Sequence, residues 1–413
     1  MVVGQAVSMA GSLVLVRVLT ESLDPEQYGE LALGLTVALL VNQVVMGGIN
    51  NGIGRFFSIA AEQQALAAYL GAARRLMGYA TLAVMAVGAI LMVALWQAGF
   101  SKWMGLTLTV LVFSILSGCN ATLNSIQNAA RQRIVVAFHG GADAWLKILL
   151  AWGMIAWLGG TSTAVVLGFA VSTLVVTGSQ LLFMRSQVPA ESGSTDPAGA
   201  WLARIWAFSW PFATWGVFSW LQQSTNRWAL EVFRGTQDVG LFAVLVQIGA
   251  TPGSLAVGLL ITFIGPILYQ RAGNSTDRAR SAGVDRMIWR LAGAGLLLTG
   301  TGFLLAWWLH PWVFKLMVAE KYRHVSHLLG WMVLSGGLLG VSQVLSQKVF
   351  CDLATRRMIL PGVATPLVGL VATVYGAHAY GLQGVVAASL FYAVFNLTWI
   401  AAIARSSRPR VQA

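Results

Sequence analysis

The chain has 413 residues, of which 57% are hydrophobic and only 10% are charged, and its formal net charge is +12 at pH 7. Soluble globular domains carry about 25% charged residues, so this composition excludes them. The basic residues are scattered through short connections and not gathered in a folded domain. Their distribution therefore argues against nucleic-acid binding and for a role in membrane orientation.

Apolar segments of about 20 residues recur along the whole sequence, and each is long enough to cross the hydrocarbon core as a helix. A β-barrel would instead show alternating segments of about 10 residues. We therefore predict an all-α membrane protein with about 12 transmembrane helices in two pseudo-symmetric six-helix bundles around a central cavity. The expected spans are Val2–Leu19, Leu31–Ile53, Leu76–Ala98, Met104–Gln127, Ala144–Leu158, Ala164–Met184, Ile205–Asn226, Leu241–Leu268, Trp289–Leu309, Leu328–Gln347, Ile359–Ala377 and Leu382–Ala404.

Two hinges with the same order of residue types indicate two related halves. The first hinge, Arg17 to Gly29, closes one apolar segment, crosses an acidic turn and opens the next segment. The second hinge, Arg227 to Gly240, repeats this order of arginine, leucine, acidic turn and glycine. A six-plus-six duplication places a substrate path between the halves. We expect Arg17 and Arg227 to face each other across that cleft.

The predicted halves are an N-terminal bundle at 1–186 and a C-terminal bundle at 204–413, with a cytosolic linker at 187–203 that is rich in Pro, Ser and Gly. With both termini placed in the cytosol, nineteen Lys and Arg residues fall on the cytosolic side and seven on the other. This bias is the positive-inside pattern of a multi-pass membrane protein. The segment Ala60–Arg75 interleaves apolar and polar helix formers, so we expect a helix lying on the cytosolic surface there.

The sequence gives no sign of a cofactor or a metal site. The chain has two cysteines, Cys119 in an apolar segment and Cys351 in a polar connection, and neither belongs to a metal-binding motif. We expect no disulfide, no metal and no cofactor.

Four short motifs carry a resemblance to a known family. They are the first helix ending Arg17-Val-Leu, the turn Leu23-Asp-Pro-Glu-Gln-Tyr-Gly, the second helix ending Gly52-Ile-Gly-Arg-Phe-Phe, and Asn124-Ser-Ile-Gln-Asn-Ala-Ala-Arg. Together with the helix number and the two halves, they resemble the polysaccharide flippases of the multidrug/oligosaccharidyl-lipid/polysaccharide exporter superfamily. The chain also resembles lipid II flippases, but it has about twelve expected helices where those have fourteen.

The resemblance implies a transporter and not an enzyme. Such a flippase would move an undecaprenyl-diphosphate-linked oligosaccharide across the bacterial inner membrane by alternating access, for surface or exopolysaccharide assembly. Its expected partners are the lipid-linked glycan, the phospholipid bilayer and a polysaccharide polymerase or synthase, and we expect a monomer. The glycan and the driving ion stay open.

The candidate substrate-binding residues are arginines for the diphosphate and amides for the sugar hydroxyls. Guanidinium groups bind phosphate oxygens bidentately and stay charged in a low dielectric. Asn120, Asn124 and Gln127 share one helical face, which forms either a cavity wall or an interhelical hydrogen-bond network, and we favour the cavity. The complete set is Arg17, Arg55, Arg227, Asn51, Asn120, Asn124, Gln127, Gln222, Gln223 and Asn226.

Tryptophans are frequent around the seventh expected span. We assign Trp201 and Trp206 to an interfacial belt, whereas Trp215 and Trp220 stay open for stacking on sugar rings.

Two other functions compete with the flippase. A cation-coupled multidrug exporter of the same superfamily would use acidic residues within the membrane, but the acids of this chain lie in or beside connections. A membrane glycosyltransferase would use Asp24 and Glu26 in the first periplasmic loop. That loop is short, and Asp-Pro-Glu is also a good turn and helix start.

Overall fold

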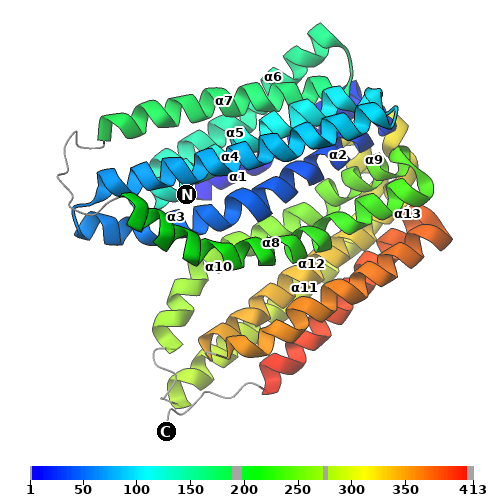
Figure 1. Ribbon diagram of the computed structural model, residues 1–413. Coiled ribbons are helices and arrows are strands. Elements are labelled where there is room, and N and C mark those ends of the chain that lie inside the picture. Colours follow the sequence, from blue (N-terminus) through cyan, green and yellow to red (C-terminus); the bar gives the residue numbers. More distant parts are fainter. Residues whose placement is uncertain (1, 188–197, 273–277, 353, 407–413) are drawn as a thin grey trace. The chain divides into compact units, whose positions relative to one another are not determined.

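The computed structural model describes residues 2–187, 198–272, 278–352 and 354–406, and these residues form helices without any strand (Figure 1). The α-helices are α1 (Val2–Ser22), α2 (Pro25–Leu40), α3 (Gly47–Glu62), α4 (Leu66–Gln97), α5 (Met104–Ala129), α6 (Arg133–Leu158), α7 (Ser162–Gln187), α8 (Ala198–Arg234), α9 (Thr236–Leu245), α10 (Thr251–Ala272), α11 (Arg278–Met317), α12 (Leu329–Cys351) and α13 (Ile359–Ser406).

Nine helical stretches of the described chain are long and apolar enough to cross a membrane. A π-helical turn, Val41–Met46, joins α2 to α3 within one such stretch, and a second, Val246–Ala250, joins α9 to α10. Each π-helical turn follows one of the two hinges. Helix α13 is broken at Gly381, whose φ of 60° and ψ of −135° are not helical. The prediction of an all-α membrane protein is confirmed for the described residues.

The prediction of a separate surface helix at Ala60–Arg75 is wrong. Helix α3 continues to Glu62, and a new helix begins at Leu66 and runs without interruption to Gln97. Tyr69, Ala72 and Leu76 are all buried. Because this face packs inside the protein, the segment continues as the first turns of α4 instead of lying on a surface.

The described chain forms two compact units. The first contains the chain up to Leu23 and residues Glu30–Gln223, and the second contains Asp24–Gly29 and the chain from Ser224 onward. The boundary between the two units therefore lies after Gln223, within α8. Most of the predicted linker, residues 188–197, lies outside the described residues, and the division at 187–203 stays a prediction.

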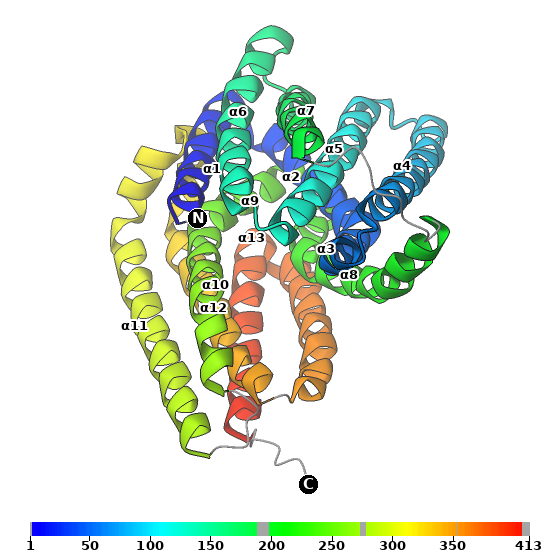
Figure 2. The ribbon, with the colours of Figure 1, turned by 90° about the vertical axis from the view of Figure 1, so that its left-hand side faces the viewer.

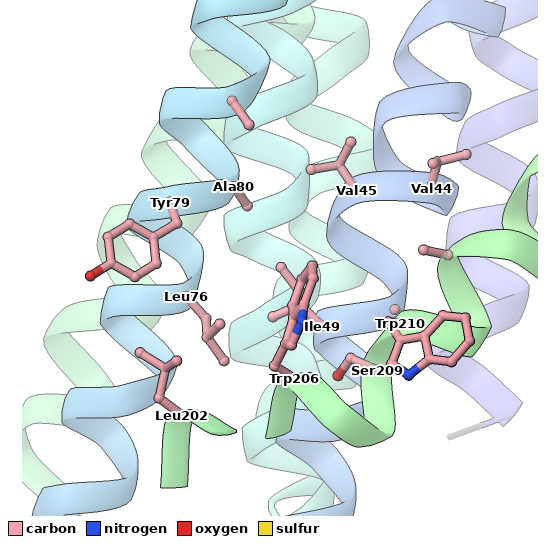
Figure 3. A pocket seen from close by; sticks show the side chains of 13 residues that line it. Val44, Val45, Ile49, Leu76, Tyr79, Ala80, Leu202, Trp206, Ser209 and Trp210 are labelled. Carbon is pink, nitrogen blue, oxygen red and sulfur yellow. The ribbon is translucent and has the colours of Figure 1, made fainter. Parts of the chain in front are cut away.

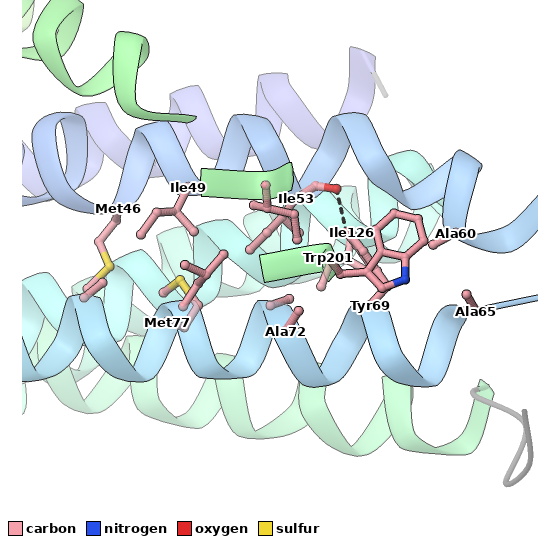
Figure 4. Close-up of a cluster of buried hydrophobic side chains, with 14 of the residues drawn as sticks. Met46, Ile49, Ile53, Ala60, Ala65, Tyr69, Ala72, Met77, Ile126 and Trp201 are labelled. Atoms are coloured by element: carbon pink, nitrogen blue, oxygen red, sulfur yellow. Dashed lines mark hydrogen bonds between the residues drawn. The ribbon is translucent and has the colours of Figure 1, made fainter. Parts of the chain in front are cut away.

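In the first unit, α6 packs against α1 and α7, and α5 packs against α3 and α7 (Figure 1). A buried cluster joins α3, α4, α5 and the start of α8 (Figure 4). In it Tyr69 donates a hydrogen bond of 2.5 Å to the Ile53 carbonyl, and its ring meets Trp201 edge to face at 5.9 Å. Trp201 is fully buried, so its predicted place in an interfacial belt is wrong. This indole instead fixes α8 to the core of the first unit.

Small residues let α8 approach α3 closely. A side chain at Gly48 would meet the Ser209 backbone, and one at Gly52 would meet the Ser209 hydroxyl. Farther along α8, a side chain at Gly216 would meet the Gln43 backbone. Glycine and serine at intervals of three or four residues are the usual means of close helix contact in membranes.

In the second unit, α12 contacts α10, α11 and α13 (Figure 2). Residues of both hinges lie together here. Gly29 packs against the Thr236 carbonyl, and Gly240 packs against the Pro25 carbonyl. Beside them Tyr28 meets Tyr322 edge to face at 5.9 Å. The two hinge glycines are therefore required by a close contact between backbones.

The substitution Gly240→Ala tests this contact. The added methyl group would overlap the Pro25 carbonyl, and we expect a loss of about 1–3 kcal/mol of stability from overpacking. Gly71→Ala is the matched control, because nothing lies within 4 Å of a methyl group at this helical position. That variant should unfold at the wild-type temperature or slightly above it. Thermal unfolding of the purified protein in detergent measures both, and equal midpoints for the two variants would contradict the assignment.

Candidate functional site

The two predicted arginines of the first unit occupy separate places. Arg17 on α1 forms an ion pair of 2.5 Å with Glu21, and its side chain is 35% exposed. Asn51 and Arg55 lie one turn apart on α3, and both are exposed. Since positions four apart share a helical face, these two side chains form a joint polar surface. Arg55 has no ion-pair partner among the described residues.

The amides of α5 form hydrogen bonds with α7. The Asn120 side chain donates to Gln180 Oε1 at 3.3 Å, and the Asn124 side chain donates to Asn120 Oδ1 at 2.9 Å. Gln180 in turn donates to Asn124 Oδ1 at 2.9 Å, and it is fully buried. The three amides thus form a closed hydrogen-bond network between α5 and α7. The sequence left this network open as the alternative, although it favoured a cavity wall. A role of Asn120 and Asn124 in binding substrate stays a prediction.

Gln127 differs from the other two amides of its face. Its side chain is fully buried, and within the described residues neither amide atom has a hydrogen-bond partner. A buried amide without partners costs free energy, so a water molecule or a ligand group would stabilise it.

The polar cluster of α8 divides between the two units. Gln222 and Gln223 are exposed at the end of the first unit, and Gln223 Nε2 donates to the Ser219 hydroxyl at 3.1 Å. Asn226 belongs to the second unit, where it accepts from Thr373 at 2.9 Å and donates to Ser389 at 3.3 Å. Thr373 and Ser389 lie on opposite sides of the break in α13, so Asn226 holds both parts of that helix.

Arg227 follows Asn226 and is half-buried in the second unit. Its guanidinium interacts electrostatically with Tyr28, whereas its Nε atom is buried without a hydrogen-bond partner among the described residues. Arg17 belongs to the first unit and Arg227 to the second, and each unit is described by itself. That the two arginines face each other across a cleft stays a prediction.

The second hinge contains another arginine, Arg234, that the sequence did not single out. Its Nε donates to the Ala377 carbonyl at 3.2 Å and its Nη2 to the His378 carbonyl at 3.0 Å. These carbonyls lie in the turn before the break at Gly381, and carbonyls at the end of a helix commonly need donors from outside the helix. Arg234 therefore stabilises the break in α13.

The two buried carboxylates of the described chain, Glu30 and Asp352, each form an ion pair with a lysine. In the first unit Glu30 lies 2.9 Å from Lys102 Nζ and accepts from Ser162 at 2.9 Å. In the second unit Lys348 Nζ lies 2.5 Å from Asp285 and 3.3 Å from Asp352. Glu30 is thus matched by one lysine, whereas Lys348 is shared by two carboxylates, so its cluster carries one more negative than positive charge.

An apolar cavity of about 520 Å³ opens in the first unit (Figure 3). It lies between three segments: the end of the π-helical turn Val41–Met46 with the start of α3, helix α4, and helix α8. Its volume is that of a small-molecule pocket. Trp206, Trp210 and Tyr79 are more than half exposed at its edge. Sequence reasoning missed the cavity because it combines helices that are distant in the chain. It is lined by Val44, Val45, Gly48, Ile49, Leu76, Tyr79, Ala80, Ala83, Leu202, Trp206, Ser209, Trp210 and Ala213.

Solved structures share the arrangement of these helices. The lipid II flippase MurJ, in an inward closed conformation, aligns with a TM-score of 0.74 at 11% identity, over 98% of this chain and 86% of that one. An inward-facing multidrug resistance transporter of the MATE family and MOP superfamily aligns with a TM-score of 0.64 at 13% identity, over 98% and 96%. The MATE multidrug transporter DinF-BH aligns with a TM-score of 0.63 at 14% identity, over 98% and 93%.

The chain shares the fold of these solved transporters. No family model matches the sequence, and no curated protein matches it. At 11% to 14% identity, the likeness to solved exporters establishes the exporter fold alone.

Removing the buried lysine tests the charge pairing. In Lys348→Ala the Asp352 carboxylate keeps its burial but loses its counter-charge, so we expect a loss of about 3–5 kcal/mol of stability. The double variant Lys348→Met with Asp352→Asn removes both charges and should recover much of that loss. Thermal unfolding measures all three proteins, and a double variant less stable than Lys348→Ala would contradict the pairing.

A double-mutant cycle tests the amide network. Asn124→Ala and Gln180→Ala should each lower the unfolding temperature, and their combination should lower it by less than the sum of the two. The expected coupling is about 0.6–1.7 kcal/mol, the range for polar contacts between membrane helices. Asn128→Ala, at an exposed amide of the same helix, is the control and should have little effect. Strictly additive losses would exclude the direct contact.

Proposed function

We propose that the protein is a flippase for an undecaprenyl-diphosphate-linked oligosaccharide in the bacterial inner membrane, serving surface or exopolysaccharide assembly. The observation that carries this proposal is the distribution of charge. The buried carboxylates Glu30 and Asp352 each have a lysine partner, whereas Arg55 and Arg227 have no ion-pair partner among the described residues. Unpaired guanidinium groups in a membrane protein suit a phosphate-bearing cargo.

We further propose twelve spans in two bundles, with both termini in the cytosol. The nine apolar stretches supply nine spans, or ten when the break at Gly381 divides α13, and α1 and α8 supply the remaining two. In this proposal the bundles alternate between inward-open and outward-open states. The cargo diphosphate meets Arg17, Arg55 and Arg227, and the amides contact the sugars. The transporter works as a monomer in the phospholipid bilayer beside a polysaccharide polymerase or synthase.

A multidrug exporter is the second candidate, because transporters of the MATE family have the same fold. Such an exporter needs acidic groups that attract a cationic drug or a coupling ion. The lysine partners of Glu30 and Asp352 favour the flippase over this candidate.

A glycosyltransferase that uses Asp24 and Glu26 is less well supported. Asp24 Oδ1 accepts a hydrogen bond of 2.8 Å from the Gln27 backbone N–H at the start of α2. This contact is that of a helix cap, so the carboxylate stabilises the turn.

Complementation of a flippase-null strain tests the proposal. The wild-type chain should restore export of the polysaccharide. The triple variant Arg17→Ala, Arg55→Ala and Arg227→Ala should reduce export by about tenfold or more, because each lost charge-assisted contact weakens the hold on the diphosphate. Export is measured as surface polysaccharide at equal protein level.

The control variant Arg74→Ala and Arg75→Ala removes two exposed arginines of α4 and should export normally. Normal export by the triple variant would overturn the role of the three arginines. Failure of the wild-type chain to complement, combined with new resistance to cationic dyes, would favour the multidrug exporter.

A further inference from the structure

A second cavity, of about 560 Å³, lies in the second unit between the end of α10 and the N-terminal half of α11. Three arginines line it: Arg271 from α10 and Arg286 and Arg290 from α11. All three are exposed, and the topology predicted from the sequence places them on the cytosolic side. None of them belongs to the set of residues that the sequence analysis selected.

The charge of this cavity is not neutralised within the described residues. No carboxylate there forms an ion pair with any of the three arginines. The neighbouring acid Asp285 pairs with Lys348 instead, at 2.5 Å. Arg286 and Arg290 are four residues apart on one helix, a spacing at which like charges repel. Such a cluster is stabilised by an anion that several guanidinium groups contact together.

The wall of the cavity beside the arginines is apolar. Met287, Leu291 and Ala294 also line it, and their spacing of four and three residues places them on one face of α11. Arg271 contacts Met287, with 3.8 Å between Nη1 and Sδ. The cavity thus joins a cationic edge to an apolar wall that continues along a helix long and apolar enough to cross the membrane. A lipid with an anionic headgroup combines the same two properties.

We propose that this cavity binds the diphosphate headgroup of a polyprenyl lipid and that its apolar wall contacts the first part of the lipid chain. This assignment rests on the proposed flippase function, for which it is a loading site on the cytosolic leaflet, separate from Arg17, Arg55 and Arg227. The number of arginines selects the headgroup. A diphosphate carries more negative charge than the single phosphodiester of a phospholipid, and it offers more oxygens to three guanidinium forks.

Titration of the purified full-length chain with undecaprenyl diphosphate tests the site, with native mass spectrometry as the readout. Undecaprenyl monophosphate and phosphatidylglycerol are titrated in parallel. We expect the wild-type chain to prefer the diphosphate. The variant Arg271→Gln, Arg286→Gln and Arg290→Gln should weaken diphosphate binding by about tenfold or more, because three charge-assisted contacts are lost. Binding of phosphatidylglycerol should change little.

Two matched variants separate a specific site from surface charge. Arg74→Gln with Arg75→Gln removes two exposed arginines that do not line the cavity, and it should bind the diphosphate as the wild type does. Replacing Arg271, Arg286 and Arg290 by lysine keeps the charge but removes the planar fork, and it should weaken binding partially. Equal losses in the glutamine variant and the α4 variant would overturn the proposal. Equal affinity of the wild type for phosphatidylglycerol and the diphosphate would also overturn it.

Failure of this binding site can be distinguished from failure of the proposed flippase function. If the wild type binds the diphosphate through these arginines but does not complement the flippase-null strain, the site stands and the transport proposal fails. If the wild type complements but the glutamine variant binds the diphosphate unchanged, transport stands and the site assignment fails. Absence of diphosphate binding by the wild type overturns the site in either case.

Discussion

The structure depends on one constraint, that polar groups in a hydrocarbon medium must find partners inside the protein. Helices satisfy the backbone, and the polar side chains pair where helices meet. Lysines form ion pairs with the buried Glu30 and Asp352, and the amides of α5 form hydrogen bonds with Gln180 of α7. Even the break in α13 is satisfied, because Arg234 donates to the carbonyls that precede it. The polar groups without such partners are therefore informative, and among the described residues they include the Gln127 amide and the Nε atom of Arg227. The three arginines of the second cavity form no ion pair there.

Close contact between helices is the other requirement, and glycine provides it at the two hinges. Gly29 and Gly240 pack against backbone carbonyls of the opposite hinge, so Asp24–Gly29 belongs to the second unit although the rest of α2 belongs to the first. Helix α8 is shared in the same way, since Trp201 is buried in the first unit and Asn226 bonds within the second. The hinge residues thus have a packing role, and Asp24 caps the helix that follows.

The arginines fall into distinct classes that composition cannot separate. Arg17 is paired with Glu21, and Arg234 stabilises a helix break. Arg55 is exposed beside Asn51, whereas Arg227 is half-buried with a free Nε atom. Arg271, Arg286 and Arg290 share a cavity with an apolar wall. An anionic lipid headgroup fits the last two classes, because none of these guanidinium groups forms an ion pair among the described residues.

The sequence by itself determined the helical membrane fold, the positions of its apolar segments and the repeat of the hinge, because hydrophobic length and glycine placement are local properties. It could not determine which side chains form hydrogen bonds or pack against each other. The face of Asn120 and Asn124 allowed a cavity or a network, and only the position of Gln180 on α7 shows the network. Likewise Trp201 has the pattern of an interfacial residue until Tyr69 and Phe56 enclose it. The apolar cavity of the first unit arises where segments distant in the chain meet, and the tertiary structure alone decides which segments these are.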